Sequence, residues 1–337
     1  MKLRTWILFR LLLTIPTILI LVTVVFAIMR ILPGDPVVAV LGSTGASVQQ
    51  IEAVRHQLGL DKPLYLQYVD YVGGLFRGDF GYSMVRGDPV ARELADHLPQ
   101  TIELTFWSML LAIPLGIYSG IFAAKKAGGK IDASIRIGAL VRWCIPVFWF
   151  GLVLQILVVQ LRLPFPIAGR ASPRFVRVAQ VTGLYVVDAI LAGDARALVD
   201  AFAHLALPVV TLGTFMAASL TKIARANIVD VLGEEYIKVA SLKGCSDERV
   251  FQKHALPNAL IPILTYTGLQ VAMLLQGAIL TETVFSWSGL GALLIEAVSY
   301  RDFNLIQGCV VLFALFVCIT NLIVDISYAV VDPRVRL

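Results

Sequence analysis

The polar stretch EYIKVASLKGCSDERVFQKHALPN, residues 235–258, lies between two apolar segments and decides how this chain is organised. Residues 234–243 are good helix formers, and Gly244 permits the left-handed conformation that ends a helix. Ser246 belongs to the residue types that cap a following helix, and Pro257 marks the next break. The stretch therefore predicts a short helix, a sharp turn and a second helix that leads into an apolar segment.

Apolar segments on both sides of this stretch are long enough to cross a bilayer. Crossing the hydrocarbon core takes about 20 apolar residues in a helix, because no water is present there to satisfy an open backbone. Of the 337 residues, 58% are hydrophobic and 15% charged, compared with roughly 25% charged residues in soluble domains. The sequence predicts an all-α membrane protein with six transmembrane helices. The predicted spans are residues 7–29, 101–124, 135–161, 202–223, 259–281 and 305–331.

The basic residues predict the orientation of the spans. An excess of Lys and Arg in short connections marks the cytoplasmic side. The connection after the second span carries Lys125, Lys126 and Lys130 with no acid before Asp132, and the chain ends and residues 222–258 are also basic. We therefore expect both termini and the 235–258 stretch to be cytoplasmic. The net charge of +5 is spread over these connections, which favours a lipid bilayer and not a nucleic acid as partner.

The first external connection, residues 31–100, has helix signals of its own. Ser47 and Gln50 form a capping box at the start of a short helix, and Pro63 and Pro89 are placed to start two more. These signals predict a small helical external subdomain between the first two spans. The chain then divides into an N-terminus with the first span (1–30), the external subdomain (31–100) and a core with five spans (101–337).

The 235–258 stretch resembles the EAA loop of ABC importer permeases. Glu235, Ala240 and Gly244 have the spacing of that loop, and His254-Ala255-Leu256-Pro257 follows after nine residues. Tyr236-Ile237 replace the two alanines after the Glu, a departure that peptide-type members share. In that family the short helix docks on a cytoplasmic ATPase. The resemblance implies an ATPase-coupling role for Glu235, Tyr236, Ala240, Gly244, His254, Leu256 and Pro257; by periodicity alone, a plain amphipathic loop remains an alternative.

The resemblance covers nearly the whole chain. Residues 32–36, 58–63, 77–83 and 281–291 are similar to the dipeptide, oligopeptide and nickel permeases, and Ala168-Gly169-Arg170 and residues 204–208 look most like the dipeptide members. The resemblance implies the type I ABC importer permease fold and transport of dipeptides or short oligopeptides across the inner membrane. Nickel, glutathione or another small solute is the alternative cargo.

The chain is not expected to be an enzyme. Gly128-Gly129-Lys130 is followed by Ile131 and lacks the rest of the phosphate-binding pattern G-x-x-x-x-G-K-[ST]. No cofactor is expected in the chain itself. The resemblance implies two ABC ATPase subunits that bind ATP and Mg, a second homologous permease and an extracytoplasmic substrate-binding protein. An ion-coupled secondary transporter, the rival class, would need no ATPase and would carry acidic groups and discontinuous helices near the midplane.

Charged groups inside spans are rare and mark candidate sites. Arg142 and Asp325 lie at similar depth in the cytoplasmic halves of the third and sixth spans, so they either pair or separately reach the interface and cap neighbouring helices. No metal site is expected, because His254 and the other histidines are scattered and the cysteines lack ligand spacing.

The external end of the fifth span carries Glu282, Trp287, Gly289 and Gly291. Glycine permits a tight backbone and Trp favours the headgroup level, so these residues suit a re-entrant turn at the outer interface. They are candidates for an external gate or for contact with the binding protein. An ordinary interfacial loop is the alternative.

Overall fold

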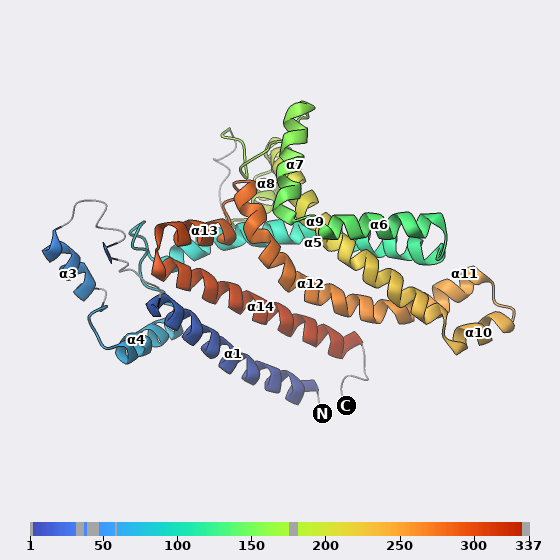
Figure 1. Cartoon of the computed structure of the whole chain (residues 1–337), viewed down its shortest axis with the longest axis horizontal. Coiled ribbons are helices and arrows are strands. Elements are labelled where there is room, and N and C mark those ends of the chain that lie inside the picture. Colours follow the sequence, from blue (N-terminus) through green and yellow to red (C-terminus); the bar gives the residue numbers. More distant parts are fainter. Residues whose placement is uncertain (1–2, 32–36, 39–46, 58, 175–180, 332–337) are drawn as a thin grey trace.

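The computed structural model describes residues 3–331 except 32–36, 39–46, 58 and 175–180, and this part of the chain is helical without β-strands (Figure 1). In chain order the elements are α1 (Leu3–Ile31), α3 (Val48–Gln57), α4 (Leu64–Phe76), α5 (Val90–Lys125), α6 (Lys130–Cys144), α7 (Val147–Gln160), α8 (Tyr185–Leu191), α9 (Ala195–Leu232), α10 (Glu235–Leu242), α11 (Asp247–Arg249), the π-helix η2 (Val250–Ala255), α12 (Leu256–Val284), α13 (Leu290–Tyr300) and α14 (Phe303–Val331).

The long helices match the predicted spans. Among the described residues, α1, α5, α9 and α14 are long and apolar enough to cross a membrane, and α6 and α7 qualify as a bent pair. The 29-residue α12 covers the predicted fifth span. The all-α membrane class is confirmed, whereas the count of six spans stays a prediction.

The predicted third span, residues 135–161, is not one helix. It is broken between Cys144 and Val147, and its halves α6 and α7 meet at a bend of 100°. Pro146 has no N–H to continue a helix, and it forces the preceding Ile145 into an extended conformation (φ −76°, ψ 122°). The kink expected at this proline is therefore a complete break.

The external connection starts as predicted and ends differently. In the capping box Gln50 N–H donates to Ser47 Oγ (3.3 Å) and Ser47 N–H to Gln50 Oε1 (2.8 Å), and α3 follows. The third external helix is not separate, because α5 runs without interruption from Val90 through Pro99 to Lys125. The boundary at residue 100 thus falls inside a helix, and the external subdomain 31–100 stays a prediction.

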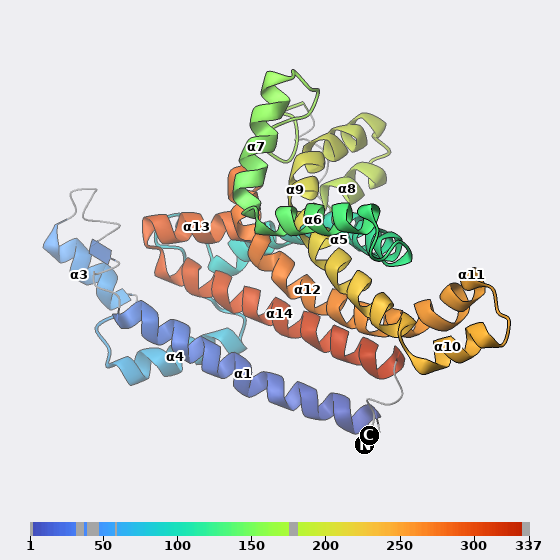
Figure 2. The same cartoon turned by 45° about the vertical axis from the view of Figure 1, so that its right-hand side comes forward.

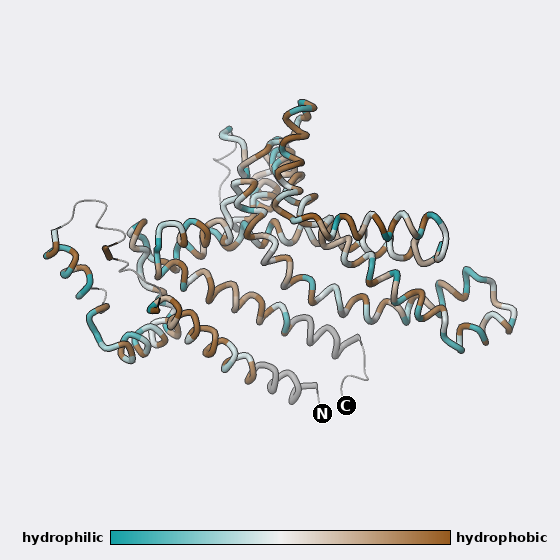
Figure 3. Tube along the Cα trace, viewed as in Figure 1, coloured by the Kyte–Doolittle hydropathy of each residue, from teal (hydrophilic) through white to brown (hydrophobic). Residues whose placement is uncertain are grey.

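The long helices lie side by side and give the molecule two distinct ends. The start of α1, the end of α14 and the α10–α11 pair lie toward one end in both views, whereas α3, α4 and α13 lie toward the other (Figures 1 and 2). Hydrophilic residues are frequent on α3 and α11, and long hydrophobic stretches lie on α1, α7 and α14 (Figure 3). This arrangement suits a bilayer between the two ends.

Two glycines bring α5 and α9 into close contact. Gly116 and Gly120 are four residues apart, so they share one face of α5. A Cβ on Gly116 would lie 2.5 Å from the Leu220 Cβ, and one on Gly120 would lie 2.5 Å from the Ala224 Cβ. Small residues allow such close backbone approach in membrane helices. The α5–α9 pair is thereby the tightly packed centre of the fold.

This packing predicts that Gly116→Leu destabilises the protein by about 1–3 kcal/mol through overpacking. The matched control is Gly138→Leu on α6, where an added Cβ meets nothing within 4 Å. Thermal unfolding of both variants in the same detergent measures the effect. Equal midpoints for the two variants would contradict the close packing.

Candidate coupling site

Helix α10 has one buried and one exposed face. Ile237 is buried and packs with Val250 and Ala255 of the π-helix η2. On the outer surface Tyr236 and Val239 are about half exposed, and Leu242 is 87% exposed. Glu235 is exposed in the first turn, where its charge suits the positive end of the helix. An amphipathic helix with unburied apolar residues is suited to binding a protein partner.

The sharp turn after α10 forms at the predicted residue. Gly244 has φ +84°, in the left-handed region that favours glycine. Its N–H donates to Ser241 O (3.0 Å) and the Cys245 N–H donates to Ala240 O (3.4 Å), which closes the end of α10. A Cβ at Gly244 would meet nothing within 4 Å, so only the backbone conformation restricts this position.

The second arm of the site joins α10 to the long helix α12. It consists of α11 and the π-helix η2, and it runs directly into α12 at Leu256. Pro257 cannot donate a helical hydrogen bond, and its ring would clash with the Lys253 carbonyl in a regular α-helix; the wider π-turn directly precedes it. Asn258 Nδ2 donates to Tyr236 Oη (3.0 Å) and to His254 O (2.8 Å). The tyrosine therefore ties α10 to the start of α12.

The site is also anchored to α5. Lys125 Nζ, at the end of α5, donates to both carboxylate oxygens of Glu248 (3.1 and 3.2 Å) and lies 4.5 Å from the centre of the Phe251 ring. The hydrogen bond from Lys125, with a second one from Gln252, lowers the pKa of Glu248. Phe251 of η2 belongs to a buried cluster that includes Ile228 of α9, and Leu256 at the start of α12 packs against this cluster. The arm formed by α11 and η2 thus contacts α5, α9 and α12.

At the end of the molecule that the sequence predicts to be external, Glu282 joins three helices. Its side chain is completely buried. It accepts hydrogen bonds from Thr101 Oγ1 of α5 (2.7 Å) and from the Gly291 and Ala292 N–H groups in the first turn of α13 (2.7 and 3.1 Å). The carboxylate holds the turn between α12 and α13 against α5.

The key residues of the predicted external turn are buried, although the turn itself reaches the surface. Trp287 is only 1% exposed, and its Nε1 donates to Gln100 O (3.0 Å). Gly289 faces the Glu282 carboxylate and Gly291 faces Ile279, so neither position has room for a Cβ. Ser286 and Ser288 are the exposed residues of this turn. Glu282 and Trp287 therefore stabilise this end of the molecule through buried contacts. Their side chains leave almost no surface that a binding protein could touch.

Several buried ion pairs were not predicted from the sequence. Arg170 forms two hydrogen bonds with Glu103 Oε2 (2.7 and 3.1 Å), and the Val186 N–H of α8 donates to Glu103 Oε1 (2.7 Å). Arg225 of α9 binds both oxygens of Asp132 in α6 (2.7 and 2.8 Å). Glu103 lies two residues inside the second predicted span, which was a detectable signal, because a carboxylate at membrane depth requires a partner.

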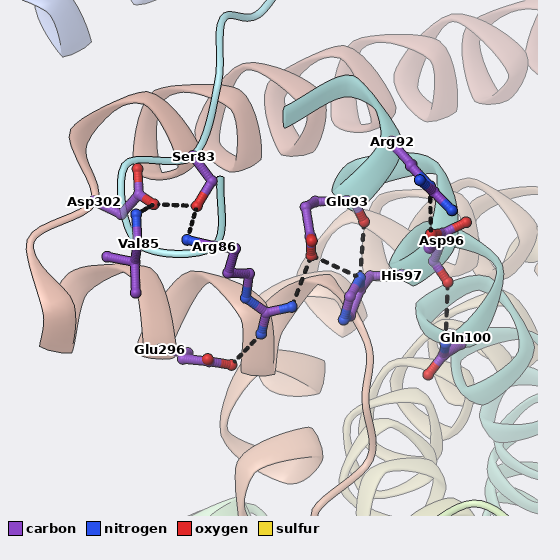
Figure 4. A network of polar contacts seen from close by, with 10 residues as sticks. All are labelled: Ser83, Val85, Arg86, Arg92, Glu93, Asp96, His97, Gln100, Glu296 and Asp302. Carbon is purple, nitrogen blue, oxygen red and sulfur yellow. Dashed lines mark hydrogen bonds and ion pairs between the residues drawn. The ribbon is translucent and has the colours of Figure 1, made fainter. Parts of the chain in front are cut away.

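A further polar network fastens the loop before α5 to the start of α14. Asp302 accepts hydrogen bonds from the Ser83 hydroxyl and the Val85 N–H (3.2 Å), and it caps α14 through the Leu305 N–H (3.2 Å). Arg86 lies between two carboxylates, Glu93 at 2.8 Å and Glu296 at 2.7 Å (Figure 4). The loop and α5 thereby meet α13 and α14, which lie more than 200 residues later in the chain.

Arg142 lies beside the break between α6 and α7. Its guanidinium donates to Thr214 Oγ1 (2.9 Å) and Thr211 O (2.6 Å) of α9 and to Ile145 O (3.3 Å), and it covers the Phe150 ring at 4.1 Å. It therefore caps neighbouring backbone, one of the two predicted roles. The side chain of Asp325 lies outside the described residues, so their pairing stays a prediction.

Comparison with known proteins identifies the class. Residues 97–337 match the family "Binding-protein-dependent transport system inner membrane component", and residues 3–105 match the N-terminal part of such membrane components. The chain belongs to this family of ABC transporter permeases, and its role in the transporter is not catalytic. This confirms the resemblance seen in the sequence and rules out the ion-coupled secondary transporter.

The chain is also similar over nearly its full length to permeases with named transport functions. The chain is 40% identical over 328 residues to the di/tripeptide transport system permease protein DppB of Pseudomonas aeruginosa, covering 97% of each chain. It is 40% identical over 333 residues to the dipeptide transport system permease protein DppB of Escherichia coli K12, covering 98% of each. The glutathione transport system permease protein GsiC of Escherichia coli is 38% identical over 331 residues, covering 97% of each.

The buried position of Glu282 predicts that Glu282→Ala strongly destabilises the protein, because each buried donor left unpaired costs about 1–3 kcal/mol. Glu282→Gln keeps one acceptor oxygen and should be intermediate. Thermal unfolding measures both variants against Glu296→Ala, which removes a half-exposed external ion pair. A midpoint for Glu282→Ala equal to that of Glu296→Ala would be inconsistent with the structural role.

The lowered pKa of Glu248 predicts a pH dependence. Because the pKa of Glu248 is lowered in the folded state, its ionised carboxylate stabilises the fold. This stabilisation is fully present above the ordinary pKa of 4.5 and is lost as the pH falls through the lowered pKa. The unfolding midpoint of Glu248→Gln should lie below that of the wild type at pH 6–7, and the difference should vanish in more acid solution. Asp247→Asn, which removes the neighbouring charge, is the control. A difference that grows below pH 4.5 would exclude this contact as its cause.

Proposed function

We propose that this chain is the permease subunit of an ABC importer that moves dipeptides or short oligopeptides across the inner membrane. The observation that carries the proposal is the 40% identity, over nearly the full length of both chains, to permeases named for dipeptides and for di- and tripeptides. The 38% identity to a glutathione permease favours glutathione, itself a tripeptide, as the second candidate cargo.

The proposed complex contains this chain, a second homologous permease, two ATPase subunits that bind ATP and Mg, and an extracytoplasmic binding protein. Both termini and α10 are cytoplasmic in the proposed orientation. The exposed face of α10, with Tyr236, Val239 and Leu242, docks on an ATPase subunit. Support comes from the position of α10 at the same end of the molecule as the start of α1 and the end of α14.

The contacts of the coupling site suggest how movement reaches the membrane. Closure of the ATPase pair on ATP shifts α10, and the Gly244 turn passes the shift to α11 and η2. From there the Tyr236–Asn258 hydrogen bond acts on α12, and the Lys125–Glu248 contact acts on α5. Since Thr101 and Glu282 join α5 and α12 again at the external end, the two helices tilt together.

The external residues take part in this proposal as positioning residues. Glu282, Trp287, Gly289 and Gly291 hold α13 and the external turn against α5, so a tilt of α5 and α12 moves the external surface around Ser286 and Ser288. In this way a buried cluster serves as part of an external gate without touching the binding protein.

The test is uptake of a labelled dipeptide by proteoliposomes that contain the complete transporter, with labelled glutathione and nickel as competing cargoes. Saturable, ATP-dependent dipeptide uptake supports the proposal. Uptake of nickel alone, or uptake that a proton gradient drives without ATP, contradicts it.

The same assay tests the coupling turn. Gly244→Val should insert normally but lose about 10-fold or more in uptake, because a left-handed conformation costs roughly 1–2 kcal/mol for ordinary residues and more for β-branched ones. Gly244→Asn is the matched control, since Asn tolerates this conformation better. Normal uptake by the Val variant at normal membrane levels would remove the turn from the mechanism.

A further inference from the structure

A basic groove lies between α6 and α9 near the end of the molecule that carries α10. It is a cavity of about 410 Å³ lined by Ala133, Arg136, Ile137, Leu140, Lys222 and Arg225. None of these residues belongs to the coupling site or to the external connection. The groove opens on a surface of α6 that the described chain leaves uncovered, since Ile137 is 62% and Leu140 50% exposed.

The groove carries an excess of positive charge. Of its three cations, Arg225 is neutralised by the two hydrogen bonds to Asp132. Arg136 and Lys222 are both exposed, and neither has an ion pair within the described part of the chain. The ammonium of Lys222 instead lies 5.5 Å from the centre of the Trp143 ring. Arg136 is near enough to the Asp132 carboxylate to help lower its pKa, but that carboxylate is already bound by Arg225. The three cations and this one anion leave the groove with an excess of two positive charges.

The apolar wall and the charges are arranged along the membrane normal. The predicted third and fourth spans reach the cytoplasmic surface near residues 135 and 223, so Arg136 and Lys222 lie at the level of the headgroups. From there Ile137 and Leu140 continue toward the hydrocarbon core. A small free anion would be bound by the cations alone, whereas an amphiphile with a negative head fits both parts of the groove. Basic pockets between transmembrane helices on the cytoplasmic side have this chemistry.

We propose that the α6–α9 groove binds an anionic phospholipid of the cytoplasmic leaflet. The phosphodiester group lies between Arg136 and Lys222, and one acyl chain follows Ile137 and Leu140. A zwitterionic lipid is disfavoured, because its own cation would face these two charges. The site depends on the proposed orientation of the chain and is independent of its cargo.

The experiment uses the complete transporter in nanodiscs made with equal amounts of phosphatidylglycerol and phosphatidylcholine. After transfer to detergent, native mass spectrometry counts the lipids retained by each complex. The wild type should retain phosphatidylglycerol in preference to phosphatidylcholine. Arg136→Gln/Lys222→Gln should weaken this binding about 10- to 30-fold, as expected for two charges near the membrane surface.

Two controls separate the groove from general charge. Lys126→Gln/Lys130→Gln removes two exposed cytoplasmic cations just before the groove and should keep the lipid. Ile137→Glu leaves both cations in place but puts a negative charge in the apolar wall, and it should release the lipid. If Lys126→Gln/Lys130→Gln loses as much bound phosphatidylglycerol as Arg136→Gln/Lys222→Gln, the proposal is overturned in favour of non-specific attraction.

Other occupants give other results, and each overturns the proposal. If inorganic phosphate displaces the retained lipid, the groove binds a free anion. If Arg136→Gln/Lys222→Gln releases the second permease subunit while lipid retention is unchanged, the groove is a contact between subunits.

Discussion

A carboxylate that is removed from water must be surrounded by hydrogen-bond donors, and this requirement shapes the whole chain. Among the described residues, five carboxylates are at most 3% exposed: Glu103, Asp132, Asp188, Glu282 and Asp302. Asp188 binds donors of its own loop, whereas each of the other four accepts a hydrogen bond from a segment far away in sequence and so fixes the position of one element against another. Asp132 joins α6 to α9, and Glu282 joins α12, α13 and α5. In a bilayer, where apolar side chains fit lipid as well as they fit protein, such polar contacts fix the register of the helices.

Helices α5 and α12 are connected at both of their ends. Lys125 and Glu248 join them on the α10 side through α11 and η2, and Thr101 and Glu282 join them directly on the opposite side. Between these points α9 lies close to α5, where Gly116 and Gly120 leave no space for a larger side chain. In the proposed mechanism, a displacement of α10 by a partner would therefore move a set of three helices. Helix α10 is only 8 residues long and is joined to them through the Gly244 turn, where an added Cβ would meet nothing within 4 Å.

Local signals in the sequence predicted the start of α3 and the turn of the coupling site, because each depends on a few neighbouring residues. Ser47 with Gln50 marked the first and Gly244 the second, and the family resemblance supplied the functional meaning of Gly244. The break at Pro146 was expected only as a kink. A sequence does not show whether contacts with neighbouring helices keep a helix continuous at a proline. Pro114 lies inside the continuous helix α5, whereas Pro146 separates α6 from α7. The partners of Glu103 and the burial of Trp287 were missed, because both depend on contacts between distant segments that periodicity does not report.

The broken third span has a consequence for how the chain is made. Its halves, α6 and α7, are 15 and 14 residues long, and neither alone reaches the length of about 20 residues that a bilayer-crossing helix needs. The groups that hold the guanidinium of Arg142 at the break, Thr211 and Thr214, belong to α9 and leave the ribosome more than 60 residues later. During synthesis Pro146 therefore breaks the helix before the partners of Arg142 exist, and the contacts that hold the two halves against the rest of the chain form only when α9 has been made.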